Sequence, residues 1–145
     1  MPEKETLERA KKDEREGKAP STQAGEFVRE EIEHVREGKH GARSTKQAIA
    51  IGLSKARRAG VKLRPPKKAS KKTREQAARD TRKGKSPGKK KSAKRSRATL
   101  AALKREGHSA VSKKALSLQA HSAAAKRSAA SRSRAAKKAA ATRKK

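Results

Sequence analysis

The sequence predicts an all-α protein in which a small helical hairpin module carries a long, largely disordered basic tail. Nine of the fifteen Leu, Ile, Val and Phe residues lie between Ser21 and Leu63, where they recur at the spacing of an amphipathic helix. These fifteen residues are about a tenth of the 145-residue chain, below the roughly 20% under which a highly charged chain is expected to be disordered. Much of the other hydrophobic content is alanine, which favours helix but buries little surface.

The positive charge of the chain is concentrated after residue 37. Residues 1–37 contain 11 acids and 8 bases, whereas residues 38–145 contain 3 acids and 36 bases, which together give a net charge of +30. A charge of this size makes binding to a polyanion the first expectation. The chain has no cysteine, so neither disulfides nor thiolate metal sites are expected.

Nothing in the sequence predicts export or membrane insertion. The N-terminal residues MPEKETLERAKKDEREG contain no apolar run of the kind that a signal peptide needs. No stretch approaches the roughly 18 apolar residues of a membrane span. We therefore expect a cytoplasmic, nucleoid-associated protein.

Composition divides the chain into four segments. Residues 1–19 are expected to form a polar, charged N-terminal helix, and residues 20–63 the helical hairpin module. Residues 64–95 read as a Pro/Gly/Lys-rich linker, and residues 96–145 as an Ala/Ser/Lys/Arg-rich tail with short transient helices. Free in solution this tail is expected to be disordered, whereas on a polyanion its alanines favour helix.

Two helices are predicted in the module, over residues 21–37 and 44–59. A serine or threonine at the start caps the first helix, and a glycine follows each helix at a position typical of a C-terminal stop. The run from Ser44 to Gln47 matches a capping box, in which the side chain of each end residue bonds the backbone N–H of the other.

The two helices of the module are expected to pair their apolar stripes as a short antiparallel hairpin. Gly52 and Ala56 lie on the stripe of the second helix and allow the backbones to approach closely. About eight core residues, at about 1.5–3 kcal/mol each, barely offset the ordering of roughly 40 residues. We therefore expect marginal stability, or a homodimer through residues 20–63 that doubles the core.

Basic side chains are the candidate nucleic-acid contacts, since Lys and Arg neutralise phosphates and release counterions without reading sequence. On the second helix of the module, the candidates form a basic outer face that could lie on a DNA groove: Lys46, Lys55, Arg57 and Arg58. The other candidates lie in the linker and the tail: Lys67, Lys68, Lys89, Lys90, Lys91, Lys94, Arg95, Arg97, Lys126, Arg127, Arg132, Arg134, Lys137, Lys138, Arg143, Lys144 and Lys145.

Short motifs add little to this prediction. The run from Ser86 to Lys90, SPGKK, resembles the Ser-Pro-basic-basic elements of tails that lie in the DNA minor groove, and it is equally well a flexible linker. Gly84-Lys85-Ser86 is not the end of a P-loop, because the motif needs a glycine at position 79, which is Arg79. The near absence of aromatic residues argues against recognition of single strands by base stacking.

No catalytic or metal-ligating residue is predicted. The four histidines lack ligand spacing and carboxylate support, and they are His34, His40, His108 and His121. No pair of a nucleophile and a base is evident, and the small apolar content predicts no cleft. We therefore expect neither a cofactor nor an enzyme.

The segment from Gly25 to Leu63 resembles a family of small basic bacterial proteins of unknown function, some of which are labelled DNA-binding or plasmid-stabilisation-like. The most specific part of the resemblance is GKHGARSTKQAIAIGLSKARRAG, from Gly38 to Gly60. The tail is similar in composition to the Lys- and Ala-rich tails of bacterial linker-histone-like proteins. These resemblances imply nucleic-acid binding and no catalytic residue.

The sequence therefore predicts non-specific binding of duplex DNA by phosphate neutralisation. One alternative is an RNA- or ribosome-associated basic protein. Another is a protein-interaction module over residues 20–63 that a polycationic tail only localises.

Overall fold

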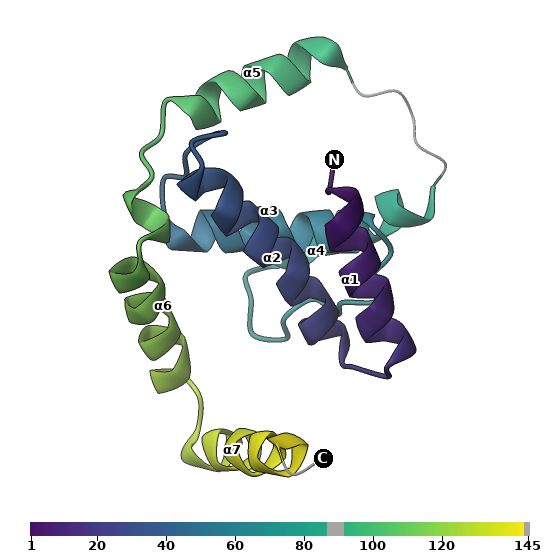
Figure 1. The fold of residues 1–145 in the computed structure, drawn as a ribbon, viewed down its shortest axis with the longest axis vertical. Coiled ribbons are helices and arrows are strands. Elements are labelled where there is room, and N and C mark those ends of the chain that lie inside the picture. Colours follow the sequence, from purple (N-terminus) through teal and green to yellow (C-terminus); the bar gives the residue numbers. More distant parts are fainter. Residues whose placement is uncertain (87–91, 144–145) are drawn as a thin grey trace. The chain divides into compact units, whose positions relative to one another are not determined.

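The structure is a computed structural model that describes residues 1–86 and 92–143, and within these residues it contains helices and no strand (Figure 1). The predicted all-helical class is confirmed. The elements are α1 (Lys4–Arg15), α2 (Pro20–Arg36), α3 (Thr45–Arg58), α4 (Lys71–Lys85), α5 (Ala93–Lys104), a 3-10 turn η1 (Ser109–Val111), α6 (Lys113–Ala125) and α7 (Ala129–Arg143). They belong to two compact units, Met1–Val111 and the residues from Ser112 onward.

The prediction of a long, largely disordered tail is wrong. Helices α5, α6 and α7 run through most of residues 93–143. Each begins after a serine whose Oγ accepts a hydrogen bond from the N–H three residues later: Ser92 from Arg95 at 3.4 Å, Ser112 from Ala115 at 3.2 Å and Ser128 from Ser131 at 3.2 Å. Serine caps and alanine-rich helix interiors supply local stability that a count of core residues does not register.

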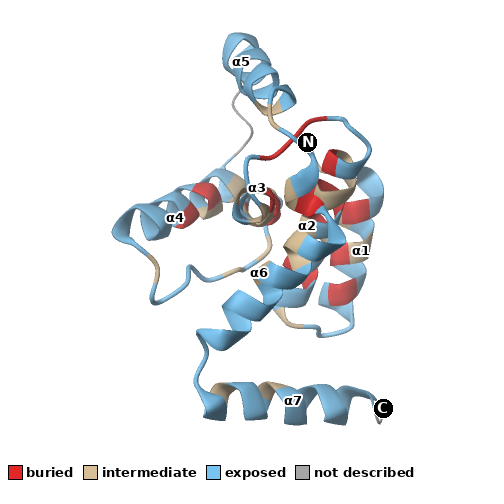
Figure 2. Cartoon of the chain, turned by 90° about the vertical axis from the view of Figure 1, so that its left-hand side faces the viewer, coloured by how far each residue is buried: buried red, intermediate tan, exposed pale blue. Residues whose placement is uncertain are grey.

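The core of the first unit is the predicted pair of helices, α2 and α3, which lie against each other (Figure 2). A Cβ placed on Gly52 of α3 would lie 2.6 Å from the Cα of Val28 in α2, so the two backbones are in near contact. The close approach predicted at Gly52 and Ala56 is confirmed, and Ala56 is fully buried.

The ends of these helices follow the predicted signals in part. Ser44 Oγ accepts a hydrogen bond from Gln47 N at 3.2 Å, as a capping box requires. The Gln47 side chain bonds the N–H of Arg43 at 2.7 Å instead of that of Ser44. Helix α2 begins at Pro20, so the predicted cap at Ser21 or Thr22 is wrong, and the residue at the cap position, Ala19, has no side chain that could accept a hydrogen bond. Proline suits the first helical position, where it has no N–H to satisfy. Gly38, with φ of 74°, follows α2, where a residue with a Cβ would be strained.

Three further elements of the chain cover the pair α2–α3, and the sequence did not predict their contribution. Helix α1 packs on α2, so that Ala10 lies beside Phe27 in one apolar cluster. Val111 of η1, from the predicted tail, lies beside Val35 in a second cluster and is 1% exposed. The apolar stripe for which we expected a homodimer is thus covered within one chain, while dimerisation itself stays a prediction.

Helix α4 is the third element, and it lies in the predicted linker. It packs on α3 through the buried Ala77 and Asp80. A Cβ on Gly84 would lie 2.5 Å from the carbonyl oxygen of Arg57, so this glycine lets α4 meet the end of α3. Residues 87–91, where the SPGKK motif ends, lie outside the described part of the chain.

The loop between α2 and α3 binds the C-terminal end of α5 and the residues that follow it. Gly41 N donates to Leu103 O at 2.9 Å, and Ala42 N donates to Gly107 O at 3.0 Å. Thr45 Oγ1 donates to Ala110 O at 2.5 Å. These bonds, with the burial of Val111, explain why the first unit extends to residue 111.

Candidate nucleic-acid interface

The four basic residues predicted to form an outer face on α3 have different surroundings. Lys46 is exposed and takes part in none of the salt bridges of the described residues. Lys55, Arg57 and Arg58 all contact other parts of the first unit. The structure therefore does not bring these four side chains together as one free basic surface.

Lys55 is held by two buried acids of α2. Its Nζ lies 3.1 Å from Glu30 Oε1 and 2.7 Å from Glu31 Oε2, and these side chains are 3% and 1% exposed. Burial by itself lowers the pKa of Lys55, but the carboxylates of Glu31 and Glu30 outweigh it and hold that pKa above its ordinary value. A charge engaged in this way is part of the core and is not available to a phosphate.

Arg57 and Arg58 face the chain segments that follow α3. Arg57 is 7% exposed, and its Nε donates to the carbonyl of Leu63 at 3.4 Å. Burial lowers the pKa of Arg57 from its ordinary value. Arg58 Nη2 lies 2.7 Å from Asp80 Oδ1, and the Arg58 side chain remains 46% exposed. Of these two residues, only Arg58 keeps a large solvent-facing surface.

Asp80 of α4 is the buried end of this contact, and sequence reasoning missed its role. Asp80 has no exposed surface and accepts hydrogen bonds from Ser54 Oγ at 2.8 Å, from Arg58 Nε at 2.8 Å and from Gln76 Nε2. Burial by itself raises the pKa of Asp80, but these hydrogen bonds and the charge of Arg58 hold it below the ordinary value. The sequence signal that could have pointed to Asp80 is that it is one of only three acids after residue 37, in a segment rich in bases.

The basic residues of the linker and the tail have the surroundings that a phosphate contact needs. Those that the structure describes are all exposed, and they are Lys67, Lys68, Lys94, Arg95, Arg97, Lys126, Arg127, Arg132, Arg134, Lys137, Lys138 and Arg143. Among the described residues, no salt bridge involves a residue after Asp80. Lys89, Lys90, Lys91, Lys144 and Lys145 lie outside the described residues.

In the described part of the second unit, all the charged side chains are basic. From Ser112 to Arg143 it contains nine Lys and Arg residues and no Asp or Glu, and all nine side chains are exposed. At about 100° per residue, Arg134, Lys137 and Lys138 fall on one side of α7, and Arg132 and Arg143 fall on the other. No residue of helices α6 and α7 is fully buried, and all their Lys and Arg side chains face solvent.

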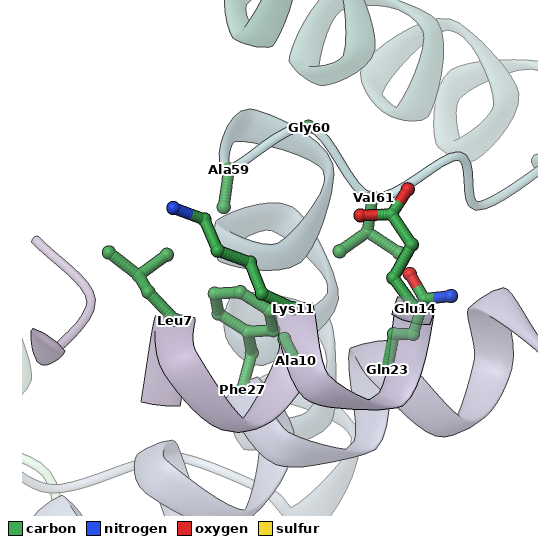
Figure 3. A pocket seen from close by; sticks show the side chains of 9 residues that line it. All are labelled: Leu7, Ala10, Lys11, Glu14, Gln23, Phe27, Ala59, Gly60 and Val61. Carbon is green, nitrogen blue, oxygen red and sulfur yellow. The ribbon is translucent and has the colours of Figure 1, made fainter. Parts of the chain in front are cut away.

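A small pocket lies on the first unit between α1, α2 and the end of α3 (Figure 3). Leu7, Ala10, Phe27 and Val61 form its apolar part, and Lys11, Glu14 and Gln23 border it. Its volume is about 110 Å³, well below the roughly 300–1,000 Å³ of a typical small-molecule site. This pocket offers little room for a substrate.

Two histidines and a buried acid meet at the other end of α2, where we expected no metal site from the sequence. One side-chain ligand atom from each of Glu31, His34 and His40 lies within 4.8 Å of the others. Glu31 and His34 are one helical turn apart on α2, and His40 belongs to the loop that follows. The signal was the spacing Glu-x-x-His, which puts both side chains on one face of a helix.

Comparison with known proteins gives a match over the module and the first residues of the linker. A family of unknown function (DUF6496) matches residues 21–69, about a third of the chain. This is consistent with the expected likeness to an uncharacterised family, and it does not extend to the tail. No curated protein and no solved structure matches the chain. No helix in residues 1–86 or 92–143 has both the length and the apolar content to cross a membrane.

Proposed function

We propose that this protein binds duplex DNA without sequence preference and associates with the nucleoid. The observation that carries the proposal is the contrast between the core of the first unit and the second unit in the described residues. In the first unit, cations such as Lys55 and Arg58 are engaged by acids, whereas the nine cations of Ser112–Arg143 have no acid in their own segment. Such unpaired, exposed cations are free to replace the counterions of a phosphate backbone.

The geometry of α7 supports a duplex as the ligand. This helix has 15 residues and five Lys or Arg side chains, which over its length of about 22 Å is roughly one cation every 4–5 Å. Phosphates follow one another about every 3.4 Å along each DNA strand. On one side of α7, Arg134, Lys137 and Lys138 lie within about 6 Å along the helix axis, so their spacing is close to that of the phosphates.

The surroundings of the single aromatic residue favour a duplex over single strands. Phe27 is the one Phe, Tyr or Trp of the chain, and it is 1% exposed in the core of the first unit. Proteins that bind single-stranded nucleic acid commonly stack exposed aromatic side chains on the bases. Here the binding rests on charge, in keeping with the linker-histone-like composition of the tail.

The test is the affinity of the full-length chain for a DNA duplex across a salt series. The triple variant Arg134→Gln, Lys137→Gln and Lys138→Gln removes three cations from one side of α7. If each contacts a phosphate, the slope of log affinity against log salt falls in magnitude by about 0.9 per contact, or about 2.7 in total. Affinity for unrelated duplex sequences should fall together.

A matched control removes the same charge from α1. The variant Lys4→Gln, Lys11→Gln and Lys12→Gln lies in the segment 1–37, which has a net charge of −3, and it should leave the slope nearly unchanged. Equal effects of the two triple variants would mean that net charge alone governs binding, which would refute the role of α7. A full-length chain that binds structured RNA more tightly than duplex DNA in direct competition would instead favour the RNA-associated alternative.

A further inference from the structure

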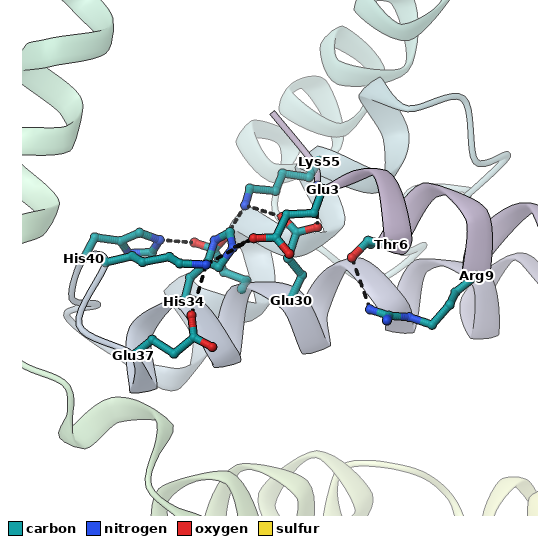
Figure 4. Close-up of polar contacts among 10 residues, drawn as sticks. Glu3, Thr6, Arg9, Glu30, His34, Glu37, His40 and Lys55 are labelled. Atoms are coloured by element: carbon teal, nitrogen blue, oxygen red, sulfur yellow. Dashed lines mark hydrogen bonds and ion pairs between the residues drawn. The ribbon is translucent and has the colours of Figure 1, made fainter.

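The cluster of Glu31, His34 and His40 contains a buried charge that the described residues leave incompletely paired. Figure 4 shows His34, His40 and Lys55 among the polar contacts of this region. The Glu31 side chain is 1% exposed, and neither of its oxygens has a hydrogen-bond partner among the described residues. Lys55 Nζ lies 2.7 Å from Oε2, a charge contact without hydrogen-bond geometry. Buried carboxylates are normally paired and hydrogen-bonded, so Oε1 needs a further partner.

His40 directs a ring nitrogen at this oxygen. His40 Nδ1 lies 3.0 Å from the carbonyl oxygen of Gly41, which can only accept, so Nδ1 carries a hydrogen. In a neutral ring, His40 Nε2 then points its lone pair at Glu31 Oε1, 3.3 Å away. Two acceptors at this distance need a cation between them, which is either a proton or a metal ion. Two ligands about 2.0–2.1 Å from a tetrahedral zinc ion are themselves about 3.3–3.4 Å apart.

His34 completes the set of ligands and has a supporting acid of its own. His34 Nε2 lies 2.9 Å from Glu3 Oε1, and the His34 side chain is 13% exposed. When Nε2 donates to Glu3, Nδ1 keeps a lone pair that can bind a metal. A carboxylate that receives the second N–H of a metal-ligating histidine is the usual outer partner in zinc sites.

The side chains around the cluster carry a net negative charge that a divalent cation would balance. Four carboxylates and two ammonium groups are joined by its ion pairs: Glu3, Glu30, Glu31, Glu37, Lys39 and Lys55. With neutral histidines this gives a local charge of −2. A doubly charged metal ion bound by Glu31, His34 and His40 would neutralise it.

We propose that Glu31, His34 and His40 bind a zinc ion, with one coordination position left for water. Two histidines and one carboxylate are a known protein ligand set for zinc. Glu31 binds through Oε1, and Lys55 remains on Oε2. The ion links α2 to the loop that contains His40, the same loop whose Gly41 and Ala42 bond the end of α5 and the residue Gly107 after it.

The test is calorimetric titration of the untagged full-length chain with Zn²⁺ alone, after removal of metal with a chelator. We expect one zinc ion per chain and a rise in the melting temperature on binding. Each of His34→Gln and His40→Gln should weaken zinc binding at least tenfold and reduce that rise at the same zinc concentration. His121→Gln, which removes a histidine from α6 in the second unit, is the matched control and should bind as the unaltered chain does.

A further variant separates metal binding from a purely structural role. His40→Cys changes the side chain but keeps a zinc ligand, so it should recover binding that His40→Gln loses. Cobalt bound in place of zinc should give the intense visible absorption of a tetrahedral site. Equal zinc binding by His34→Gln, His40→Gln and the unaltered chain would overturn the proposal, and so would an unaltered chain that does not bind zinc at micromolar concentration.

Discussion

The close contact between α2 and α3 makes Gly52 the position where the smallest possible change should have a large effect. In Gly52→Ala, the new Cβ would lie 2.6 Å from Val28 Cα, 2.9 Å from Val28 N and 3.0 Å from Phe27 O. All three neighbours are backbone atoms of α2, so a rotation of one side chain cannot relieve the overlap. The two helices must move apart, which also loosens the packing around Phe27.

The magnitude follows from two opposing terms. Overpacking of a core costs about 1–3 kcal/mol, and the backbone contact puts Gly52→Ala near the upper value. Replacing glycine by alanine within a helix contributes about 1 kcal/mol in the other direction. The net loss in the free energy of unfolding is therefore about 2 kcal/mol. For a unit of this size that corresponds to a fall of roughly 8–16 °C in melting temperature.

Gly25 provides the matched control in α2. It lies inside the helix with no atom within 4 Å of an added Cβ, so Gly25→Ala gains the helix propensity without the overlap. We expect it to be about 1 kcal/mol more stable than the unaltered chain. Hydrogen exchange of the Val35 and Ala48 amides reports on this unit without the signal of α6 and α7. Equal stabilisation by the two variants would refute the close crossing of α2 and α3.

Two further predictions concern buried charges of the first unit. Asp80→Asn removes the acid that Arg58 contacts and should lower the free energy of unfolding by about 1–3 kcal/mol. Glu75→Asn removes an exposed acid from the same helix and should lower it little. Urea unfolding measures both changes. Because the folded-state pKa of Asp80 is depressed, the ionised side chain stabilises the folded protein in full above the unfolded pKa of about 4, and this contribution is lost as the pH falls below that value. The melting temperature of Asp80→Asn should therefore depend less on acid pH than that of the unaltered chain. Lys55→Met removes the lysine that pairs with two buried carboxylates and should lower the free energy of unfolding by about 3–5 kcal/mol. Lys46→Met, at an exposed position of the same helix, should change it by no more than about 0.5 kcal/mol, and thermal melts compare the two. Similar stability of these two lysine variants would mean that Lys55 is not held as described.

The distribution of paired charges gives the two units different physical characters. The first unit places ion pairs such as Lys55–Glu31 and Arg58–Asp80 at its core, where one partner of each is almost fully buried. The second unit has helices without a buried face and cations without acids. Raising the salt concentration should therefore weaken the proposed DNA contacts far more than it weakens the folded first unit, since buried pairs are screened less than exposed charges.

The sequence by itself predicted those features that neighbouring residues determine. The helical class, the pair α2–α3, the cap at Ser44, the stop at Gly38 and the close approach at Gly52 all follow from patterns within a few residues. The same kind of signal was present in the tail, where serines precede alanine-rich runs. The tail helices were predicted to be short and transient because the apolar content is low, although local caps and helix propensity also favour ordered helix.

Only the tertiary structure decided which distant residues meet. Lys55 pairs with acids about 25 positions earlier, Arg58 with an acid 22 positions later, and Val111 joins Val35 in the core. The meeting of Glu31, His34 and His40 likewise depends on how the loop after α2 turns back on the helix. A basic residue looks the same in the sequence whether it faces water or a buried carboxylate, because its surroundings come from segments that no local pattern specifies.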